Sequence, residues 1–189
     1  WFGLRRWLGP PRVRNEWRNL QAFRVLGVPT ATLVAFGLER RFGAFIRGAL
    51  ITEEIPQTTD LAQLARAGDP RLRDARWVRH VARQIADIAR RLHRAHFAHN
   101  DFKWRNLLVD GGDEPTVYLI DCPSGNHYRG AILDYRIVKD LACLDKLARR
   151  HLSRSQRLRF YLDYVQHPRL TADDRKQIGR IVNFFAGRD

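Results

Sequence analysis

The sequence contains no methionine, and among its 189 residues it has only two cysteines, Cys122 and Cys143. Two cysteines are too few for a disulfide framework or a cysteine-based zinc site, so we expect the protein in a reducing compartment. Because translation begins with methionine, the residue at position 1 also leads us to expect that the natural chain extends upstream of Trp1.

Long hydrophobic runs are absent as well. No apolar stretch approaches the roughly 20 residues that a membrane-spanning helix requires, and the first residues do not follow the pattern of a signal peptide. Hydrophobic residues nevertheless make up 44% of the chain, enough for a substantial core. The sequence therefore predicts one domain, or one lobe together with part of another.

Lysine is scarce although the chain is strongly basic. The formal net charge is +14, yet 30 of the 34 basic residues are arginine. Such a charge attracts nucleic acid, acidic lipid headgroups or phosphorylated glycans, whereas the arginine bias also fits coding composition without any partner. Charge alone leaves both interpretations open. Nucleic acid is not expected, because the aromatic residues fall mostly on predicted core stripes and form no stacking platform.

The motif with the clearest chemistry is His-Asn-Asp-Phe-Lys-Trp-Arg-Asn at residues 99–106, followed by Asp121 after an apolar strand. Enzymes of phosphoryl transfer position the nucleophile and neutralise charge with cations. In that chemistry Asp101 would accept the hydroxyl proton, and Lys103, a lysine where arginine is the usual cation, would offset phosphoryl charge. Asn106 and Asp121 carry oxygen ligands suited to Mg²⁺, which takes only one or two protein carboxylates and keeps waters.

Hydrophobic periodicity predicts the elements around this motif. The strongest signal is an apolar stripe at steps of three and four residues between 71 and 96, typical of a long amphipathic helix. Further helices are expected at 13–26, from 59 or 60 to 67, and at 133–151, 154–166 and 171–185. Strands are expected at 31–39, 45–54, 107–109 and 116–120, the first two as neighbours in one sheet.

The turn signal Asp-Gly-Gly-Asp at 110–113 predicts a hairpin between the last two strands. A hairpin would bring Asp121 back beside Asn106, so that both could bind one metal ion. Without it, Asp121 would merely end a strand at a proline turn. Asp140 could hold the 99–106 loop in place or pair at the surface, and we expect His99 to orient that loop by hydrogen bonding.

The motif resembles the catalytic loop H-R-D-x-x-x-x-N and the metal-binding D-F-G of the protein-kinase superfamily. Asp101, Asn106 and Asp121 fall on its loop aspartate, its asparagine and the aspartate of D-F-G. Two departures are visible, because Asn100 replaces the loop arginine and Asp-Cys-Pro replaces D-F-G. Both are more typical of a small-molecule or glycan kinase than of a protein kinase regulated by phosphorylation.

Three further segments resemble the bacterial lipopolysaccharide kinase family: Asn-Glu-Trp-Arg-Asn-Leu at 15–20, Leu-Gly-Val-Pro-Thr at 26–30 and Leu-Ile-Thr-Glu-Glu at 50–54. The resemblance implies an α+β, protein-kinase-like fold, with a partial, N-terminally truncated N-lobe sheet at 1–55 and a mostly helical C-lobe at 56–189. It also implies ATP with Mg²⁺ as the donor, and a sugar hydroxyl of the lipopolysaccharide inner core as the acceptor.

By the same resemblance, Glu16 would hold a strand lysine on the nucleotide phosphates, and the backbone of Glu53, Glu54 and Ile55 would form the hinge that meets adenine. From the residues alone, Glu16 could instead interact with the dipole at its helix N-terminus, and the two later glutamates could be ordinary solvated charges. The enzyme would be cytoplasmic, in peripheral contact with the anionic inner face of the membrane.

One part of the kinase pattern is missing. No lysine precedes Lys103, and Gly3 and Gly9 do not form a glycine-rich phosphate loop. We expect these elements upstream of Trp1, and we expect the chain as given to bind ATP poorly. The alternatives are a small-molecule kinase of the aminoglycoside type and an inactive pseudokinase that binds a partner or anionic lipid.

Overall fold

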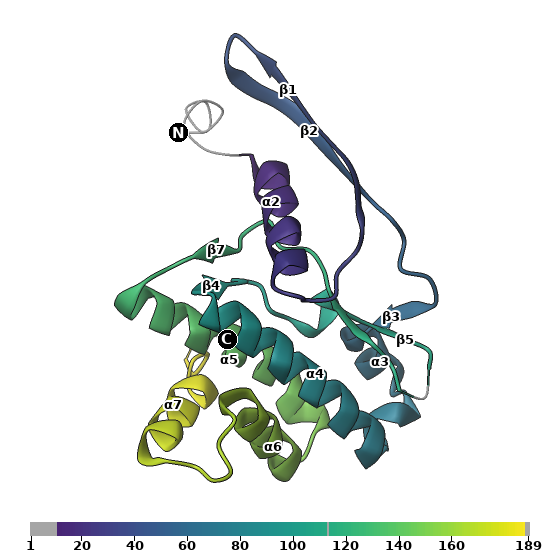
Figure 1. Ribbon diagram of the computed structural model, residues 1–189. Coiled ribbons are helices and arrows are strands. Elements are labelled where there is room, and N and C mark those ends of the chain that lie inside the picture. Colours follow the sequence, from purple (N-terminus) through teal and green to yellow (C-terminus); the bar gives the residue numbers. More distant parts are fainter. Residues whose placement is uncertain (1–10, 113, 188–189) are drawn as a thin grey trace.

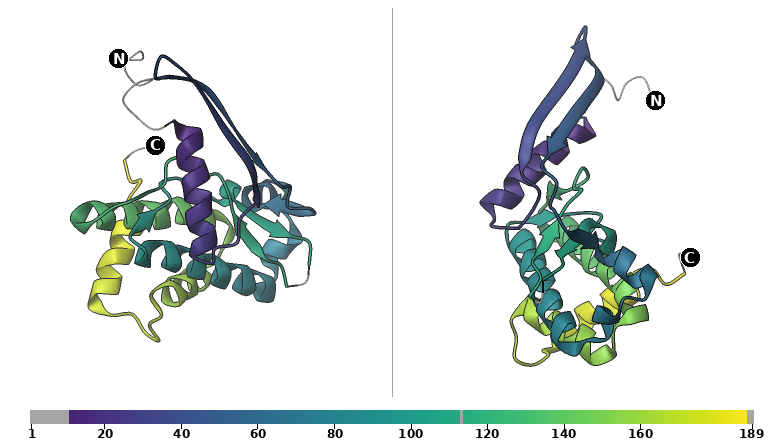
Figure 2. Two further views of the ribbon diagram at one scale, coloured as in Figure 1. Left: turned by 45° about the horizontal axis from the view of Figure 1, so that its top comes forward. Right: turned by 90° about the vertical axis from the view of Figure 1, so that its right-hand side faces the viewer.

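The computed structural model describes residues 11–112 and 114–187. In Figure 1 a long strand hairpin and the helix α2 stand above a mainly helical part, and Figure 2 shows the same two levels from other sides. The fold is therefore α+β, as predicted. None of the helices in the described ranges is long and apolar enough to cross a membrane.

The upper level consists of α2 (Arg12–Val25) and the antiparallel strands β1 (Leu33–Arg41) and β2 (Ala44–Thr52). The predicted pairing of these strands is confirmed. Helix α2 lies beside the hairpin, where the ring of Trp17 stacks on Phe36 with centroids 5.3 Å apart. Glu16 is the fifth residue of α2 and lies beyond its first turn, so the proposed interaction with the helix N-terminus loses its geometric basis.

A small sheet connects the two levels. Its strand order is β3-β5-β6, and all neighbours are antiparallel: β3 (Thr58–Asp60), β5 (Leu107–Asp110) and β6 (Val117–Leu119). The predicted β5–β6 hairpin is confirmed. The strands β3, β4 (Phe97–Ala98) and β7 (Asn126–His127) were not predicted, because two or three residues are too few to show alternation.

The lower level is built around α4 (Ala75–Arg94), whose predicted stripe is buried throughout. The prediction placed the start of this helix too early, at residue 71. Residues Pro70–Arg73 form a separate 3-10 turn, and the Asp74 side chain accepts hydrogen bonds from the backbone of Arg76 and Trp77, which begins α4 at Ala75.

Four other helices complete this level: α3 (Leu61–Ala67), α5 (Gly130–His151), α6 (Arg154–Val165) and α7 (Ala172–Val182). Two of them differ from prediction, since α5 starts three residues earlier than expected and α7 ends three residues earlier. Asp60 caps α3, and capping boxes at Ser153 and Thr171 begin α6 and α7. In Figure 1, α6 and α7 lie below α4 and α5.

The lower end of α2 is anchored in the helical part. The ring of Phe23 meets Phe97 edge-on at 5.7 Å and stacks on His99 at 6.0 Å. The Leu119 backbone N–H donates to the carbonyl oxygen of Pro29 at 2.9 Å. These contacts position α2 against the segment that contains the predicted catalytic residues.

Candidate active site

Helix α5 holds the 99–106 loop from behind. The Asp140 carboxylate is fully buried and accepts hydrogen bonds from the backbone N–H of His99 at 2.7 Å and of Asn100 at 2.9 Å. Next to it, Lys139 Nζ donates to the carbonyl oxygen of Asn100 at 3.0 Å. Of the two expectations for Asp140, the structure therefore supports the one in which it fixes the loop.

Asn100 ties the loop to the segment after Asp121. Its backbone is left-handed, with φ of 67°, a conformation that asparagine adopts more readily than most residues. Its Nδ2 donates to the Ser124 carbonyl oxygen at 2.7 Å and to the Tyr128 hydroxyl at 2.9 Å. The buried side-chain amide of Asn100 thus connects the loop to the segment that follows Asp121.

His99 is fully buried between aromatic rings, stacking on Phe23 and on Phe102. Its Nδ1 accepts from the backbone N–H of Asp101 at 3.4 Å. Burial, which outweighs the nearby Asp140 carboxylate, lowers the pKa of His99. A neutral imidazole that hydrogen-bonds within the loop fits the orienting role expected from the sequence.

The Asp101 carboxylate is bonded to two cations. Its Oδ1 lies 2.5 Å from Lys103 Nζ, and its Oδ2 accepts from Arg105 Nη2 at 2.8 Å. Burial alone would raise the pKa of Asp101, but the hydrogen bonds from Lys103 and Arg105 outweigh it and hold that pKa below its ordinary value. Arg105 was not predicted as a site residue, although its four-residue spacing from Asp101 was a visible signal.

Asn106 lies between the loop and the strand that leads to Asp121. Its Nδ2 donates to the Asp101 carbonyl oxygen at 2.8 Å, and its own carbonyl oxygen accepts from the Ile120 N–H at 3.0 Å. The hairpin thus brings the backbone just before Asp121 beside Asn106. In the described ranges the side-chain oxygen of Asn106 has no hydrogen-bond partner, so it is free to bind a ligand.

Asp121 meets the other predicted nucleotide-binding residues in one cleft. It lines a cavity of about 400 Å³ together with Glu16 from α2 and with Glu53, Glu54 and Ile55 after β2. We call this cavity the acidic cleft. Residues 53–55, which were predicted as the hinge, therefore face the same space as the carboxylates of Glu16 and Asp121. The backbone of Asp121 is left-handed, with φ of 58°.

The acidic cleft is short of positive charge. Burial first, and then the neighbouring Asp121 carboxylate, raise the pKa of Glu16, against a smaller opposing effect of Arg12. Among the described residues neither Glu16 nor Asp121 forms an ion pair or a hydrogen bond through its carboxylate. Asp121 in the cleft carries a carboxylate, and Asn106, which does not line the cleft, carries a free amide oxygen. Both are hard oxygen ligands of the kind that Mg²⁺ takes, so the chemistry of these two residues fits that ion.

Sequence reasoning missed Asn19, which connects α2 to the segment after Asp121. Its Nδ2 donates to the carbonyl oxygens of Cys122 at 2.7 Å and of Gly125 at 2.9 Å. A side chain at Gly125 would clash, because a Cβ there would lie 2.4 Å from Cys122 Sγ and 2.5 Å from the Phe97 ring. The sequence signal that could have identified Asn19 was the Asn-Glu-Trp-Arg-Asn-Leu segment at 15–20, which contains both Glu16 and Asn19.

Asp101 and Lys103 do not line the acidic cleft. They line a second cavity of about 480 Å³, formed by the loop, α3 and α5, which we call the basic pocket. Its charged lining consists of Asp101 and six cations: Arg66, Lys103, Arg105, Lys139, Lys146 and Arg150. The predicted residues are thus divided between two cavities, with Asn106 linking the segments that carry Asp101 and Asp121.

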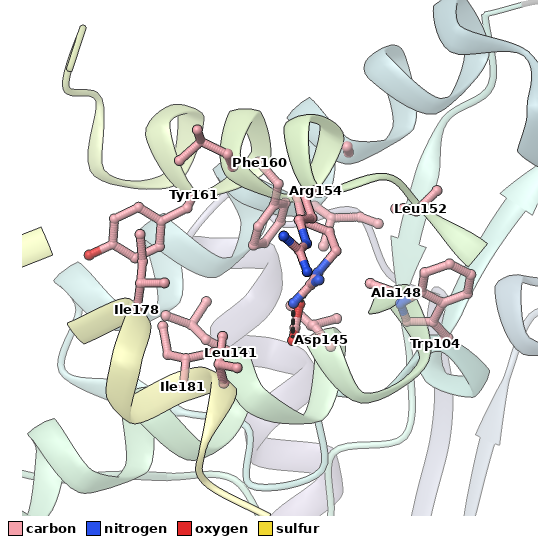
Figure 3. A pocket seen from close by; sticks show the side chains of 16 residues that line it. Trp104, Leu141, Asp145, Ala148, Leu152, Arg154, Phe160, Tyr161, Ile178 and Ile181 are labelled. Carbon is pink, nitrogen blue, oxygen red and sulfur yellow. Dashed lines mark hydrogen bonds and ion pairs between the residues drawn. The ribbon is translucent and has the colours of Figure 1, made fainter. Parts of the chain in front are cut away.

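A third cavity, of about 470 Å³, lies among the helices of the lower level (Figure 3). Its lining is mostly apolar, and Figure 3 shows Leu141, Phe160, Ile178 and Ile181 around it. The carboxylate of Asp145 on this lining is occupied, since each of its oxygens accepts from Arg157 at 2.7 Å. The cavity is therefore not suited to proton or phosphoryl transfer.

The sequence matches a model of the lipopolysaccharide kinase (Kdo/WaaP) family over residues 3–164. It is 30% identical over 174 residues to the lipopolysaccharide core heptose(I) kinase WaaP of Pseudomonas aeruginosa. That alignment covers 82% of this chain and 60% of the relative, so the chain spans about three fifths of the length of the curated enzyme.

Solved structures also resemble the fold. A structure described as WaaP in complex with acyl carrier protein superposes with a TM-score of 0.69 and 26% identity, over 89% of this chain and 73% of that one. A Rad53 kinase domain superposes with a TM-score of 0.52 and 19% identity, over 88% and 68% of the two chains. The predicted protein-kinase-like fold is thereby confirmed.

Proposed function

The chain belongs to the lipopolysaccharide kinase (Kdo/WaaP) family, and on that premise we propose that it forms part of an ATP-dependent kinase for a sugar hydroxyl of the lipopolysaccharide inner core. The observation that carries the proposal is the shared cleft of Glu16, Asp121 and the hinge residues 53–55. The loop with Asp101 and Lys103 is joined to this cleft through Asn106.

Each residue then has a role in phosphoryl transfer. The Asp101 carboxylate accepts the proton of the sugar hydroxyl, for which it must release one of its bonds to Lys103 and Arg105. Lys103, freed from Asp101, then neutralises charge on the transferred phosphoryl group. Asn106 and Asp121 would hold Mg²⁺, which supplies charge neutralisation on the donor phosphates.

The nucleotide would be bound mainly by the upper level. The backbone of residues 53–55 would meet the adenine edge, and Glu16 would pair with the lysine that binds the nucleotide phosphates. The resulting division places a partial N-lobe at 1–55 and the C-lobe at 56–189. The arginine-rich surface would keep the enzyme at the anionic inner face of the cytoplasmic membrane, near its lipid-anchored acceptor.

The test is the substitution Asp101→Asn in the full-length protein, measured as phosphate transfer from labelled ATP to purified lipopolysaccharide core. General-base groups typically contribute at least about 100-fold, and we expect a loss of that size. Asp173→Asn is the matched control, because its side chain is 92% exposed on α7. Full activity of Asp101→Asn would refute catalysis by this loop, and transfer only to soluble aminoglycosides would refute the acceptor.

A protein partner is a second proposal. One solved relative is described in complex with acyl carrier protein, and the net charge of +14 favours an anionic partner. We infer that this chain also binds acyl carrier protein. Isothermal titration of the full-length protein with acyl carrier protein tests this, and an absence of heat at low ionic strength would contradict it.

A further inference from the structure

The basic pocket has more cations in its lining than the carboxylate there can neutralise. Among the residues that the structure describes, six cations line it and Asp101 is the only carboxylate of its lining. Asp101 already has two of these cations, Lys103 and Arg105, as partners. The remaining four are therefore in excess, in a cavity large enough for a sugar ring.

The excess charge comes from two walls. On α5, Lys139, Lys146 and Arg150 follow one another at steps of seven and four residues, so they lie along one face of the helix. Arg66, in the last turn of α3, contributes from a separate element. This placement gathers the exposed cations Arg66, Lys146 and Arg150 beside Asp101.

Three of these four cations have no counter-charge. Lys139 is engaged, because its Nζ donates to the Asn100 carbonyl oxygen. Within the described part of the chain, Arg66, Lys146 and Arg150 form no ion pair and no hydrogen bond, and Lys146 only lies over the ring of Phe185 at 5.1 Å. Clustered cations repel one another, and a bound anion relieves that repulsion.

The type of cation argues against composition as the cause. The chain contains four lysines, and three of them, Lys103, Lys139 and Lys146, line this one pocket. Elsewhere arginine is the rule. Lysine presents a compact charge on a flexible stem and can follow an anion whose position changes during reaction.

We propose that the basic pocket binds an anionic group of the acceptor itself, a carboxylate or phosphate close to the hydroxyl that is phosphorylated. Lys146, Arg150 and Arg66 bind this group and so present the hydroxyl to Asp101. The inference rests on the proposed function, since it concerns the acceptor side of the same site. It defines the substrate class as an acidic or already phosphorylated sugar.

The first experiment measures steady-state kinetics of the double variant Lys146→Ala/Arg150→Ala in the full-length protein. Loss of two charge-assisted contacts should raise KM for the native core acceptor about tenfold or more, with kcat and KM for ATP changed less than about twofold. Lys176→Ala is the matched control, because Lys176 is exposed on α7 and pairs only with Asp173. Equal KM values for the double variant and this control would overturn the inference.

Modified acceptors then identify the anion. Reduction of the acceptor carboxylates to alcohols, or removal of its phosphates, should raise KM of the wild-type protein in one of the two arms. On that modified acceptor the double variant should no longer differ from wild type. If neither modification changes KM, the pocket does not bind an acceptor anion.

Direct binding separates this inference from the proposed function. Inorganic phosphate is titrated into the protein without ATP, and the shifts of the lysine side-chain resonances are followed by NMR. Wild type that binds phosphate at Lys146 but phosphorylates no core acceptor would refute the proposed function and leave the anion site standing. Phosphate shifts that are equal in wild type and in Arg66→Ala/Arg150→Ala would refute the anion site.

Discussion

Glu16 and Asp101 are both partly buried carboxylates, yet their pKa values shift in opposite directions. In the acidic cleft, burial and the Asp121 carboxylate raise the pKa of Glu16. In the basic pocket, Lys103 and Arg105 more than compensate for burial and lower the pKa of Asp101. The difference lies in the neighbours, since neither carboxylate is deeply buried.

The contrast shows what each cavity is built to receive. The acidic cleft has carboxylates without cations and is stabilised by a metal ion or a lysine. The basic pocket has six cations and the single carboxylate of Asp101 among its described lining residues, so a bound anion would stabilise it. A phosphoryl group that passes between them would leave a site that holds cations and enter one that compensates negative charge.

The largest effect is expected for Asp140→Ala, because Asp140 holds the loop that links both cavities and its loss should disturb both of them. The substitution leaves two backbone N–H groups, of His99 and Asn100, without their acceptor. Each buried group left unsatisfied costs about 1–3 kcal/mol, so we expect the free energy of unfolding to fall by several kcal/mol. Urea unfolding measures it, with the exposed Asp173→Ala as control. A loss equal to that of the control would contradict the role of Asp140.

Asp121→Asn should impair the acidic cleft and leave the basic pocket intact. Removing this carboxylate should lower kcat of the full-length enzyme about 100-fold, the usual effect of losing one major electrostatic contact to the transition state. KM for the acceptor should stay unchanged, because the basic pocket is intact. A kcat within about threefold of wild type, after correction for folded fraction by calorimetry, would separate Asp121 from the chemistry.

Side-chain titration by NMR should show the two cavities responding independently. Asp121→Asn removes a neighbouring negative charge and should lower the pKa of Glu16 while leaving Asp101 unchanged. Arg105→Ala removes a donor and should raise the pKa of Asp101 while leaving Glu16 unchanged. Crossed effects, in which either variant shifts both carboxylates, would show that the cavities are electrostatically coupled.

The smallest expected effect is on the pH dependence of the free energy of unfolding. Because folding raises the pKa of Glu16, its contribution is complete below the ordinary glutamate pKa and is lost as pH rises through the raised value. For Asp101, whose pKa is lowered, the contribution is present above the ordinary aspartate pKa and is lost as pH falls through the lowered value. Urea unfolding, repeated across the acidic pH range, gives the slope of the free energy of unfolding against pH. Relative to wild type, this slope should change in opposite directions in Glu16→Gln and in Asp101→Asn.

The sequence predicted the elements that have many residues and a clear period. The stripe of α4, the β1–β2 pair and the β5–β6 hairpin were all recognisable. The resemblances to known families named Glu16, residues 53–55 and Asp121 in separate roles before any geometry was known, and all of them line the acidic cleft.

What could not be predicted depends on contacts between distant residues. Asn19 bonds to the Cys122 and Gly125 carbonyls across 103 and 106 positions, and an asparagine in a helix gives no sign of its partner. The division of Asp101 and Asp121 between two cavities is a property of the cavity walls, which α3 and α5 supply for the basic pocket and α2 and the segment after β2 supply for the acidic cleft. Short strands such as β4 and β7 exist only because a neighbour pairs with them.

The two cysteines make local opening measurable without any introduced label. Cys122 directly follows Asp121 and is fully buried, while Cys143 lines the basic pocket and is 7% exposed. Burial raises the pKa of both thiols, that of Cys143 to about 11, so neither is a ready nucleophile in the native fold. Pulsed alkylation followed by mass spectrometry would thus measure the rate of local opening separately at Cys122 and at Cys143. A ligand that slows alkylation at one of the two thiols would identify which cavity it fills.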